Sequence, residues 1–400
     1  MLARLKSLRP SVRALLSMYW TNTLAGGIVG VFIQLYLYQR FTSVPLNIIA
    51  SLASYTGIML AFCGGGYLAS LFRINLKYGF AISFVVTALA ILWVPHTTDF
   101  SQACAAMFGW GFGQGFFWLT GNAFELAETV DGERDYYASM LSAGNQVLSL
   151  AGPALGTLLI WLSGSILQWG TYTLLFIVAP AVYFLGFFSI AYLRDYWPPR
   201  IVWADIGYFF SDRKNQYAQV YTLGTGVQQI LGTTIPPLAI LFILGTALRV
   251  GVYDTAFAVV SIICVLVIAR YRTPTNRLQM YFLTIVGLIL TTVWFGYELT
   301  FFVLVGYTLL SAVLGPLNSV TGHVIDLAAM EIGRKETDFY ATMLLRDFSL
   351  WVWRFVGGVG FLFLLQFVHT EREFLSIGLY VIAAGFAVDY LGAYLFVRKA

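Results

Sequence analysis

The chain contains a segment that occurs twice, about half a chain length apart. The letters TGNAFELAE begin at Thr120, and the related letters TGHVIDLAA begin at Thr321. Shortly after each block, DYYASML from Asp135 returns as DFYATML from Asp338. A chain of 400 residues with such a repeat is expected to hold two copies of one structural unit. Paired units of this kind are typical of membrane proteins that open one central site to either side in turn.

Both copies are hydrophobic enough to be membrane bundles. Hydrophobic residues make up 59% of the chain and charged residues 10%, against about 25% charged residues in soluble domains. A membrane-spanning helix needs about 20 apolar residues. The long runs with few or no charges are 14–39, 41–72, 78–98, 100–124, 136–193, 215–248, 250–269, 278–297, 299–325, 339–366 and 374–397.

These runs predict twelve spans, six in each half, because the run 136–193 is long enough for two. A transmembrane barrel is excluded, since its strands would alternate polar and apolar residues over about ten positions. We therefore expect an all-α membrane protein whose twelve transmembrane helices form two pseudo-symmetric six-helix bundles. The domains expected are a bundle at 1–193, a cytoplasmic linker at 194–216 and a second bundle at 217–400.

The positions of Lys and Arg predict the orientation. With the N-terminus inside, outside loops hold only Arg40, Arg249 and Arg372, and nearly all other Lys and Arg residues fall in cytoplasmic segments. Cytoplasmic loops carry this excess in membrane proteins. We expect an integral, multi-pass protein of a bacterial cytoplasmic (inner) membrane, with both termini in the cytoplasm. The same topology accounts for the net charge of +4, so the charge does not indicate nucleic-acid binding.

The linker 194–216 contains a mixture of apolar and charged residues. Pro198 and Pro199 end the sixth span, and the aromatic and aliphatic residues after them alternate with acids and an arginine. This pattern predicts a short amphipathic helix on the membrane surface, and a linker with interfacial aromatic residues is the alternative.

The architecture resembles the major facilitator superfamily, whose loop after the second span has a Gly-x-x-x-Asp-Arg-x-Gly-Arg-type motif. The matching segment here is GYLASLFRINLKYG from Gly66, in which Ser70 stands at the place of the acid and Leu71 at that of the arginine. The charge-relay gate of the family is therefore not expected. A second segment, Gly152-Pro153-Ala154-Leu155-Gly156, is similar to an element that the family's exporters, which are antiporters, carry in their fifth span. Gly152, Pro153 and Gly156 also suit a helix kink with close packing.

The resemblance implies a secondary active transporter that moves a small solute by alternating access. We expect proton coupling and export. An uptake symporter and a lipid flippase are alternatives on the same fold, and a membrane sensor is the alternative without transport. The partners expected are the solute, protons or another cation, and membrane lipids, and the protein is expected to be a monomer.

The repeat marks one set of candidate residues for coupling. Asn122 and Glu125 lie three residues apart on one helical face, and His323 and Asp326 occupy the matching places in the second copy. Ionisable residues within spans are costly and are functional candidates by default. By analogy with the family, these two helices line a central cavity. The set fits proton transfer or a weak divalent-cation site, whereas acids near a span's end can also be solvated caps.

A second set of candidates has no counterpart in the first copy. Arg346, Asp347 and Arg354 lie in the predicted eleventh span. A buried arginine can bind an anionic group of a solute, or it can form a salt bridge that only fixes packing. We expect Asp326 as the partner of Arg346. The uncharged candidates for the cavity are Asn22, Gln34, Gln114, Gln228, Gln229 and Asn318.

An enzyme is not expected. The chain has three histidines, and they are not clustered as a metalloenzyme would require. It also has no phosphate-binding loop for a nucleotide. We therefore expect no catalytic residues, no cofactor and no resident metal.

Overall fold

The computed structural model describes the chain at residues 8–128, 131–269, 277–330 and 339–399, and every regular element in these ranges is a helix. The elements of the first half are α2 (Pro10–Phe41), α3 (Val44–Met59), α4 (Gly65–Phe72), α5 (Lys77–Trp93), α6 (Phe100–Glu128), α7 (Asp131–Trp161) and α8 (Thr173–Phe187). Those of the second half are α9 (Trp203–Ser211), α10 (Arg213–Gly232), α11 (Ile235–Leu244), α12 (Ala247–Ala269), α13 (Arg277–Tyr297), α14 (Phe301–Met330), α15 (Phe339–Leu364) and α16 (Glu371–Lys399). A π-helical turn at Leu60–Gly64 joins α3 to α4 in one continuous rod.

Many of these helices can cross a membrane. Within the described residues, eight helical segments are long and apolar enough to do so. They are Pro10–Phe41, Val44–Phe72, Lys77–His96, Val147–Ile166, Thr173–Tyr192, Arg213–Leu244, Phe339–Phe367 and Glu371–Arg398. The predicted all-helical membrane protein is therefore confirmed, whereas the count of twelve spans stays a prediction.

The contacts within the chain divide it into two compact units. The first unit comprises Met1–Tyr36 and Ala53–Ile201, and the second comprises Leu37–Leu52 and Val202–Ala400. The chain thus passes between units at Ile201 and Val202, inside the predicted linker 194–216. The end of α2 and the start of α3 group with the second unit, which the sequence did not suggest. The assignment of six spans to each unit stays a prediction.

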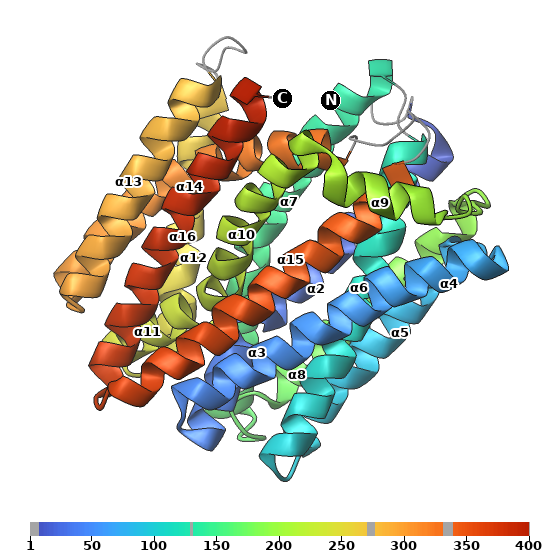
Figure 1. Ribbon diagram of the computed structural model, residues 1–400. Coiled ribbons are helices and arrows are strands. Elements are labelled where there is room, and N and C mark those ends of the chain that lie inside the picture. Colours follow the sequence, from blue (N-terminus) through green and yellow to red (C-terminus); the bar gives the residue numbers. More distant parts are fainter. Residues whose placement is uncertain (1–7, 129–130, 270–276, 331–338, 400) are drawn as a thin grey trace. The chain divides into compact units, whose positions relative to one another are not determined.

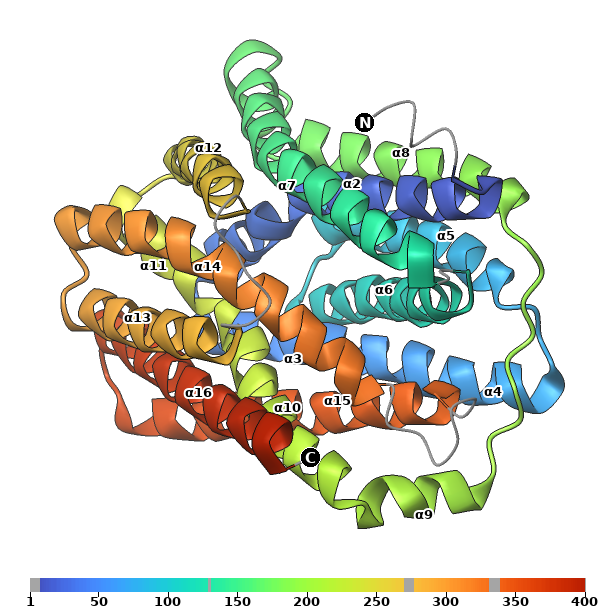
Figure 2. The ribbon, with the colours of Figure 1, turned by 90° about the horizontal axis from the view of Figure 1, so that it is seen from above.

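In the first unit, α6 packs tightly on two sides through glycines, and Figure 2 shows it beside α5. Gly111 and Gly115 face α3, where an added Cβ would collide with the carbonyl oxygens of Ser54 and Ile58. Gly113 faces α5, where a Cβ would collide with the Thr87 hydroxyl. Lipid offers no hydrophobic drive for helix association, so close backbone packing through small residues supplies the stability.

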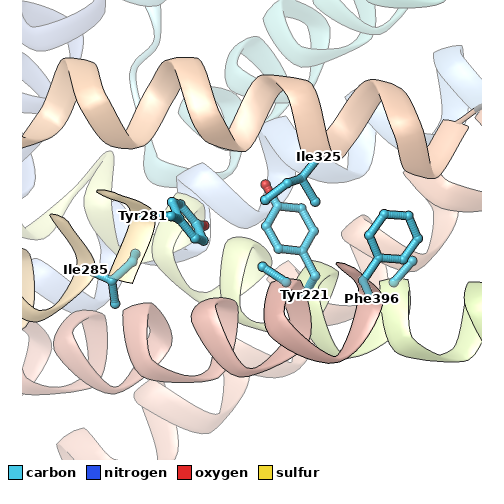
Figure 3. Packing of buried hydrophobic residues seen from close by; sticks show 7 residues of the cluster. Tyr221, Tyr281, Ile285, Ile325 and Phe396 are labelled. Carbon is cyan, nitrogen blue, oxygen red and sulfur yellow. The ribbon is translucent and has the colours of Figure 1, made fainter. Parts of the chain in front are cut away.

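In the second unit, α16 packs along both α10 and α13, and Figure 1 shows α13, α14 and α16 running alongside one another. A cluster of buried side chains joins four of these helices (Figure 3). Its labelled members are Tyr221 of α10, Tyr281 and Ile285 of α13, Ile325 of α14 and Phe396 of α16. This core positions α10, which carries part of the candidate site.

The predicted amphipathic helix forms as α9. Phe209 is buried and its neighbour Phe210 is 54% exposed, so the helix has an inner and an outer face. The inner face lies against the second unit, because α9 packs on α15 and α10. An acid at the third helical position, Asp205, accepts a hydrogen bond from the Val202 amide and caps the N-terminus.

Candidate functional site

A polar seam joins three helices of the first unit. The Gln114 side chain, from α6, donates to the Asn22 side-chain oxygen of α2 at 3.1 Å and to the Tyr183 hydroxyl of α8 at 3.4 Å. Close by in sequence, the Thr23 hydroxyl donates to the side-chain oxygen of Asn145 on α7 at 2.9 Å. The predicted residues Asn22 and Gln114 are therefore bonded to each other. Tyr183 was not predicted, since nothing in the sequence distinguishes it from the other tyrosines.

Gln34 lies elsewhere on α2. It is buried, but it stands twelve positions after Asn22, which is about 18 Å along a helix at 1.5 Å per residue. The structure therefore does not bring Gln34 into the seam of Asn22 and Gln114.

Glu125 is a buried acid between two buried tyrosines. Its residue is 9% exposed, while Tyr19 of α2 and Tyr137 of α7 are 4% and 0% exposed. The Tyr19 hydroxyl lies against Gly121, one helical turn before Glu125 on α6. Both tyrosine rings are close enough to interact electrostatically with the Glu125 carboxyl. Asn122 is half-buried on the same stretch of helix.

The next acid on α6, Glu128, has a different environment. Its carboxylate accepts a hydrogen bond from the Ser11 hydroxyl at 2.7 Å and lies 3.7 Å from the Arg9 guanidinium. Arg9 also donates to the Glu128 carbonyl oxygen. Glu128 thus ties the end of α6 to the start of α2. The sequence analysis did not single it out, although it lies one turn after Glu125 and just beyond an uncharged run.

The second unit contains a buried guanidinium. Arg354 of α15 is 7% exposed and donates through Nε and Nη2 to the side-chain oxygen of Gln229 on α10, with a distance of 2.8 Å for Nε. Asp347, two turns earlier on α15, is also 7% exposed. The charges of Arg354 and Arg346 both act on its carboxyl. The structure therefore brings four predicted residues into one cluster, in which Asp347 and Arg354 are buried and Gln229 and Arg346 are half-buried.

Gln228 points to another helix than its neighbour Gln229. Its amide donates to the carboxylate of Asp389 on α16 at 3.0 Å, and Asp389 is 4% exposed. Successive residues of a helix differ by about 100° in direction, so two adjacent glutamines cannot serve one site equally. Asn318 is half-buried in α14. The side chains of His323 and Asp326 lie outside the described residues, and so does the expected pairing of Asp326 with Arg346.

The Gly-Pro element of α7 lies against α2. A Cβ added to Gly152 would stand 2.6 Å from the Gly27 Cα, and one added to Gly156 would stand 2.6 Å from the Ile28 carbonyl oxygen. Pro153 lies inside the helix, where its carbonyl oxygen accepts from the Thr157 hydroxyl at 2.8 Å. These glycines permit the close approach of the two helix backbones.

Asp254 is an acid that the sequence analysis overlooked. It lies half-buried in α12, inside the run 250–269 that the sequence analysis counted as a span without selecting this acid. The preceding residue, Tyr253, donates to the Leu304 carbonyl oxygen of α14 at 3.2 Å. In the part of the chain that the structure describes, no group of three His, Cys, Asp or Glu residues could hold a metal ion.

Solved membrane transporters have a similar fold over nearly the whole chain. The nucleoside transporter NupG, in a mutant form, superposes with a TM-score of 0.68 at 13% identity, covering 96% of this chain and 98% of that one. The human organic anion transporter MFSD10 (TETRAN) gives a TM-score of 0.67 at 12% identity, with 97% and 99% covered. A bacterial homologue of the human lysosomal transporter Spinster gives 0.63 at 13% identity, with 97% of each chain covered.

No protein-family model matches the sequence, and no curated protein matches it closely. Three-dimensional similarity therefore carries the comparison, and identities near 13% inform on fold rather than on substrate. The resemblance seen in the sequence is confirmed at that level: the chain has the fold of the major facilitator superfamily.

Proposed function

We propose that the protein is a secondary active transporter that moves a small solute by alternating access, coupled to protons. The fold, shared with transporters, supports transport in general. The proposal extends to twelve spans in two pseudo-symmetric six-helix bundles, with both termini in the cytoplasm of a bacterial cell and a monomer as the working form. Its main support is the buried cluster around Arg354, since lipid-spanning helices rarely keep a guanidinium without a functional reason.

The solute carries an anionic group that Arg354 binds. The Arg354 guanidinium donates to the side-chain oxygen of Gln229, a neutral amide that an anionic group of the solute can replace as acceptor. Asp347 is shared electrostatically between Arg354 and Arg346. A guanidinium is suited to carboxylate or phosphate because its planar fork can form two parallel hydrogen bonds. One structural neighbour is described as an organic anion transporter, which is compatible with this chemistry.

Glu125 carries the coupling proton. A buried carboxyl that exchanges a proton needs groups that stabilise its charged form; the Tyr19 hydroxyl is near enough to donate to Glu125, and Tyr137 interacts with this carboxyl electrostatically. His323 and Asp326 are the matching residues of the second copy and complete the proposal. Export is favoured by the Gly152-Pro153 element, whose likeness to the exporter motif is the reason for this direction.

Transport assays in proteoliposomes test the proposal. The purified protein is first screened against metabolites, drugs and metal ions by thermal shift, because a ligand of the native state raises the melting temperature. The stabilising solutes are then assayed for accumulation under an imposed pH gradient. Accumulation that follows the gradient supports the proposal. Binding without any flux would indicate a sensor, and movement of labelled lipid alone would indicate a flippase.

Two acids of α6 provide a matched pair of variants. Glu125→Gln should abolish accumulation driven by the pH gradient while exchange of solute down its own gradient persists. Glu128→Gln removes a similarly buried acid that already has Ser11 and Arg9 as partners, so it should retain coupling. Accumulation at the parental rate by Glu125→Gln would show that this carboxyl is structural.

A further inference from the structure

The last turn of α4 and the loop from α4 to α5 hold the beginning of the linker between the units. This segment is the place of the family motif, and Ser70, in the last turn of α4, stands there instead of an acid. Ser70 is 2% exposed, and its hydroxyl donates to the Pro199 carbonyl oxygen at 2.6 Å. The same hydroxyl oxygen accepts from the Ile201 amide at 3.0 Å. One side chain therefore bonds the linker on both sides of Arg200.

A hydroxyl is suited to this position, and a carboxylate is not. Serine can donate one hydrogen bond and accept others through the same atom, whereas an ionised aspartate only accepts. An aspartate at Ser70 would place a negative charge against the Pro199 carbonyl oxygen in a buried position, and the repulsion would move the linker, and with it the Ile201 amide, away from the side chain. The exchange of the motif's acid for serine is therefore what allows this contact.

A second anchor lies at the other end of the loop. The Asn75 side chain donates to the Asp195 carboxylate at 2.7 Å and accepts from the Tyr196 amide at 3.2 Å. The Leu76 amide donates to the Tyr196 carbonyl oxygen at 2.9 Å. Lys77 forms a salt bridge with Asp195. Both the backbone and the side chains of the loop therefore form hydrogen bonds with the linker at Asp195 and Tyr196.

The segment between the two anchors is stiff. Pro198 and Pro199 have fixed φ angles and no amide hydrogen, so they favour an extended chain without needing partners of their own. The Tyr196 ring also packs on Phe124 of α6, with ring centroids 5.7 Å apart. The linker from Asp195 to Ile201 is therefore part of the first unit, in agreement with the boundary that the contacts place after Ile201.

The next residue already belongs to the cap of α9. The Val202 amide donates to the Asp205 carboxylate at 3.3 Å, and its carbonyl oxygen accepts from the Asp205 amide at 3.0 Å. The last clamped amide, Ile201, and the first residue of the helix cap are thus neighbours in sequence. We propose that the segment from Ser70 to Lys77 is a dock for the linker, and that it reduces the flexible joint within the linker to the pair Ile201–Val202. The other two crossings between the units lie inside the helices α2 and α3, so movement of one unit against the other bends the linker at this pair or releases the dock.

Residue-resolved hydrogen exchange on the detergent-solubilised full chain tests the dock. In the parent, the amides of Tyr196 and Ile201 should exchange more slowly than that of Arg200, for which the described residues provide no hydrogen bond. Ser70→Ala should make the Ile201 amide exchange about tenfold faster, since one tenfold step corresponds to the loss of a buried hydrogen bond. Asn75→Ala should do the same for Tyr196.

Two further variants separate the hydroxyl from the size and charge of the side chain. Ser70→Thr should keep the protection of Ile201, whereas Ser70→Asp, which restores the family's residue, should lose it. Ser101→Ala is the control, because that exposed hydroxyl bonds to Asp99 two residues before it, far from the linker in sequence. Equal exchange at Ile201 and Arg200 in the parent would overturn the proposal, and so would full protection in Ser70→Asp. The parental comparison holds even where a variant fails to fold.

Discussion

Replacing Arg354 distinguishes a solute-binding residue from a packing residue. Arg354→Met keeps most of the length of the side chain and removes its charge. The change loses the hydrogen bonds to Gln229, and bonds from a charged donor contribute about 1.5–3 kcal/mol. It also removes the cost of burying a cation, which is several kcal/mol before compensation. Arg346 also acts on Asp347, so part of the compensation for that buried carboxyl remains. We expect a net destabilisation of about 2 kcal/mol or less from these opposing terms.

The affinity for an anionic solute should fall much more. Loss of a two-pronged contact to an anion costs about 1.5–3 kcal/mol, which is roughly 10-fold to 100-fold in Kd. Arg354→Lys keeps the charge but loses the planar fork, so its affinity should lie between those of the parent and of Arg354→Met. Two quantities are measured on the same preparations. One is the melting temperature without solute, and the other is the Kd, by calorimetry, for the solute found in the thermal-shift screen.

Arg372→Met is the matched control, because this arginine is exposed in a predicted outside loop. It should leave both the stability and the affinity unchanged. A loss of about 3–5 kcal/mol in Arg354→Met, the range for breaking a buried ion pair, together with an unchanged Kd, would refute the role in binding. Gln229→Leu adds a second check. If Arg354 is a packing residue, a double-mutant cycle should show that Arg354 and Gln229 are coupled in stability by about 1–3 kcal/mol.

Individual positions of the structure yield three further predictions. A thiol at Thr98 should react with an impermeant reagent added to intact cells, and one at Lys214 should react only after the membrane is opened; both positions are exposed. Hydrogen bonding by Lys77 holds the pKa of the exposed Asp195 carboxyl below its usual range. This stabilisation is present above the unfolded pKa of about 3.9 and is lost as the pH falls through the lower folded value, so Asp195→Asn should lower the melting temperature at pH 7 but not in strong acid. Gly111→Ala should destabilise the protein by about 1–3 kcal/mol in thermal unfolding, because its Cβ would collide with the backbone of α3.

Each of these has an outcome that would contradict it. Labelling of a thiol at Lys214 in intact cells would show that the predicted orientation in the membrane is wrong. A melting difference for Asp195→Asn that persists unchanged in strong acid would mean that the charge is not responsible. Gly64→Ala is the control for packing, since a Cβ there meets no atom within 4 Å. Equal melting of the Gly111 and Gly64 variants would show that α3 and α6 are less tightly packed than described.

The features that follow from composition and periodicity could be read from the sequence. Long uncharged runs must be helical in lipid, because each backbone amide needs a partner that only a helix or a closed barrel provides. The helix α9 was also predictable, since the prolines before it and its alternating faces are local signals. Glu125, Arg354 and Asp347 could be selected as candidates because a charge inside a span is conspicuous in any single sequence.

Contacts between distant residues could not be read in this way. Gln228 and Gln229 are identical neighbours, yet one bonds to Asp389 of α16 and the other to Arg354 of α15. Ser70 was noted only as a missing acid, whereas in the structure it binds the linker through Pro199 and Ile201. Which face of a helix meets which neighbour depends on how the helices pack, and a single sequence contains no direct record of that packing.

The sequence by itself determined that this protein is a helical membrane bundle with an internal repeat and a few buried charges, because hydrophobicity and spacing along the chain suffice for that. Only the tertiary structure decided which of those charges meet, where α6 is held between its neighbours by glycine contacts, and where the chain passes from one unit to the other. These properties depend on side chains brought together from helices far apart in the chain, and their geometry follows from close packing rather than from any local pattern.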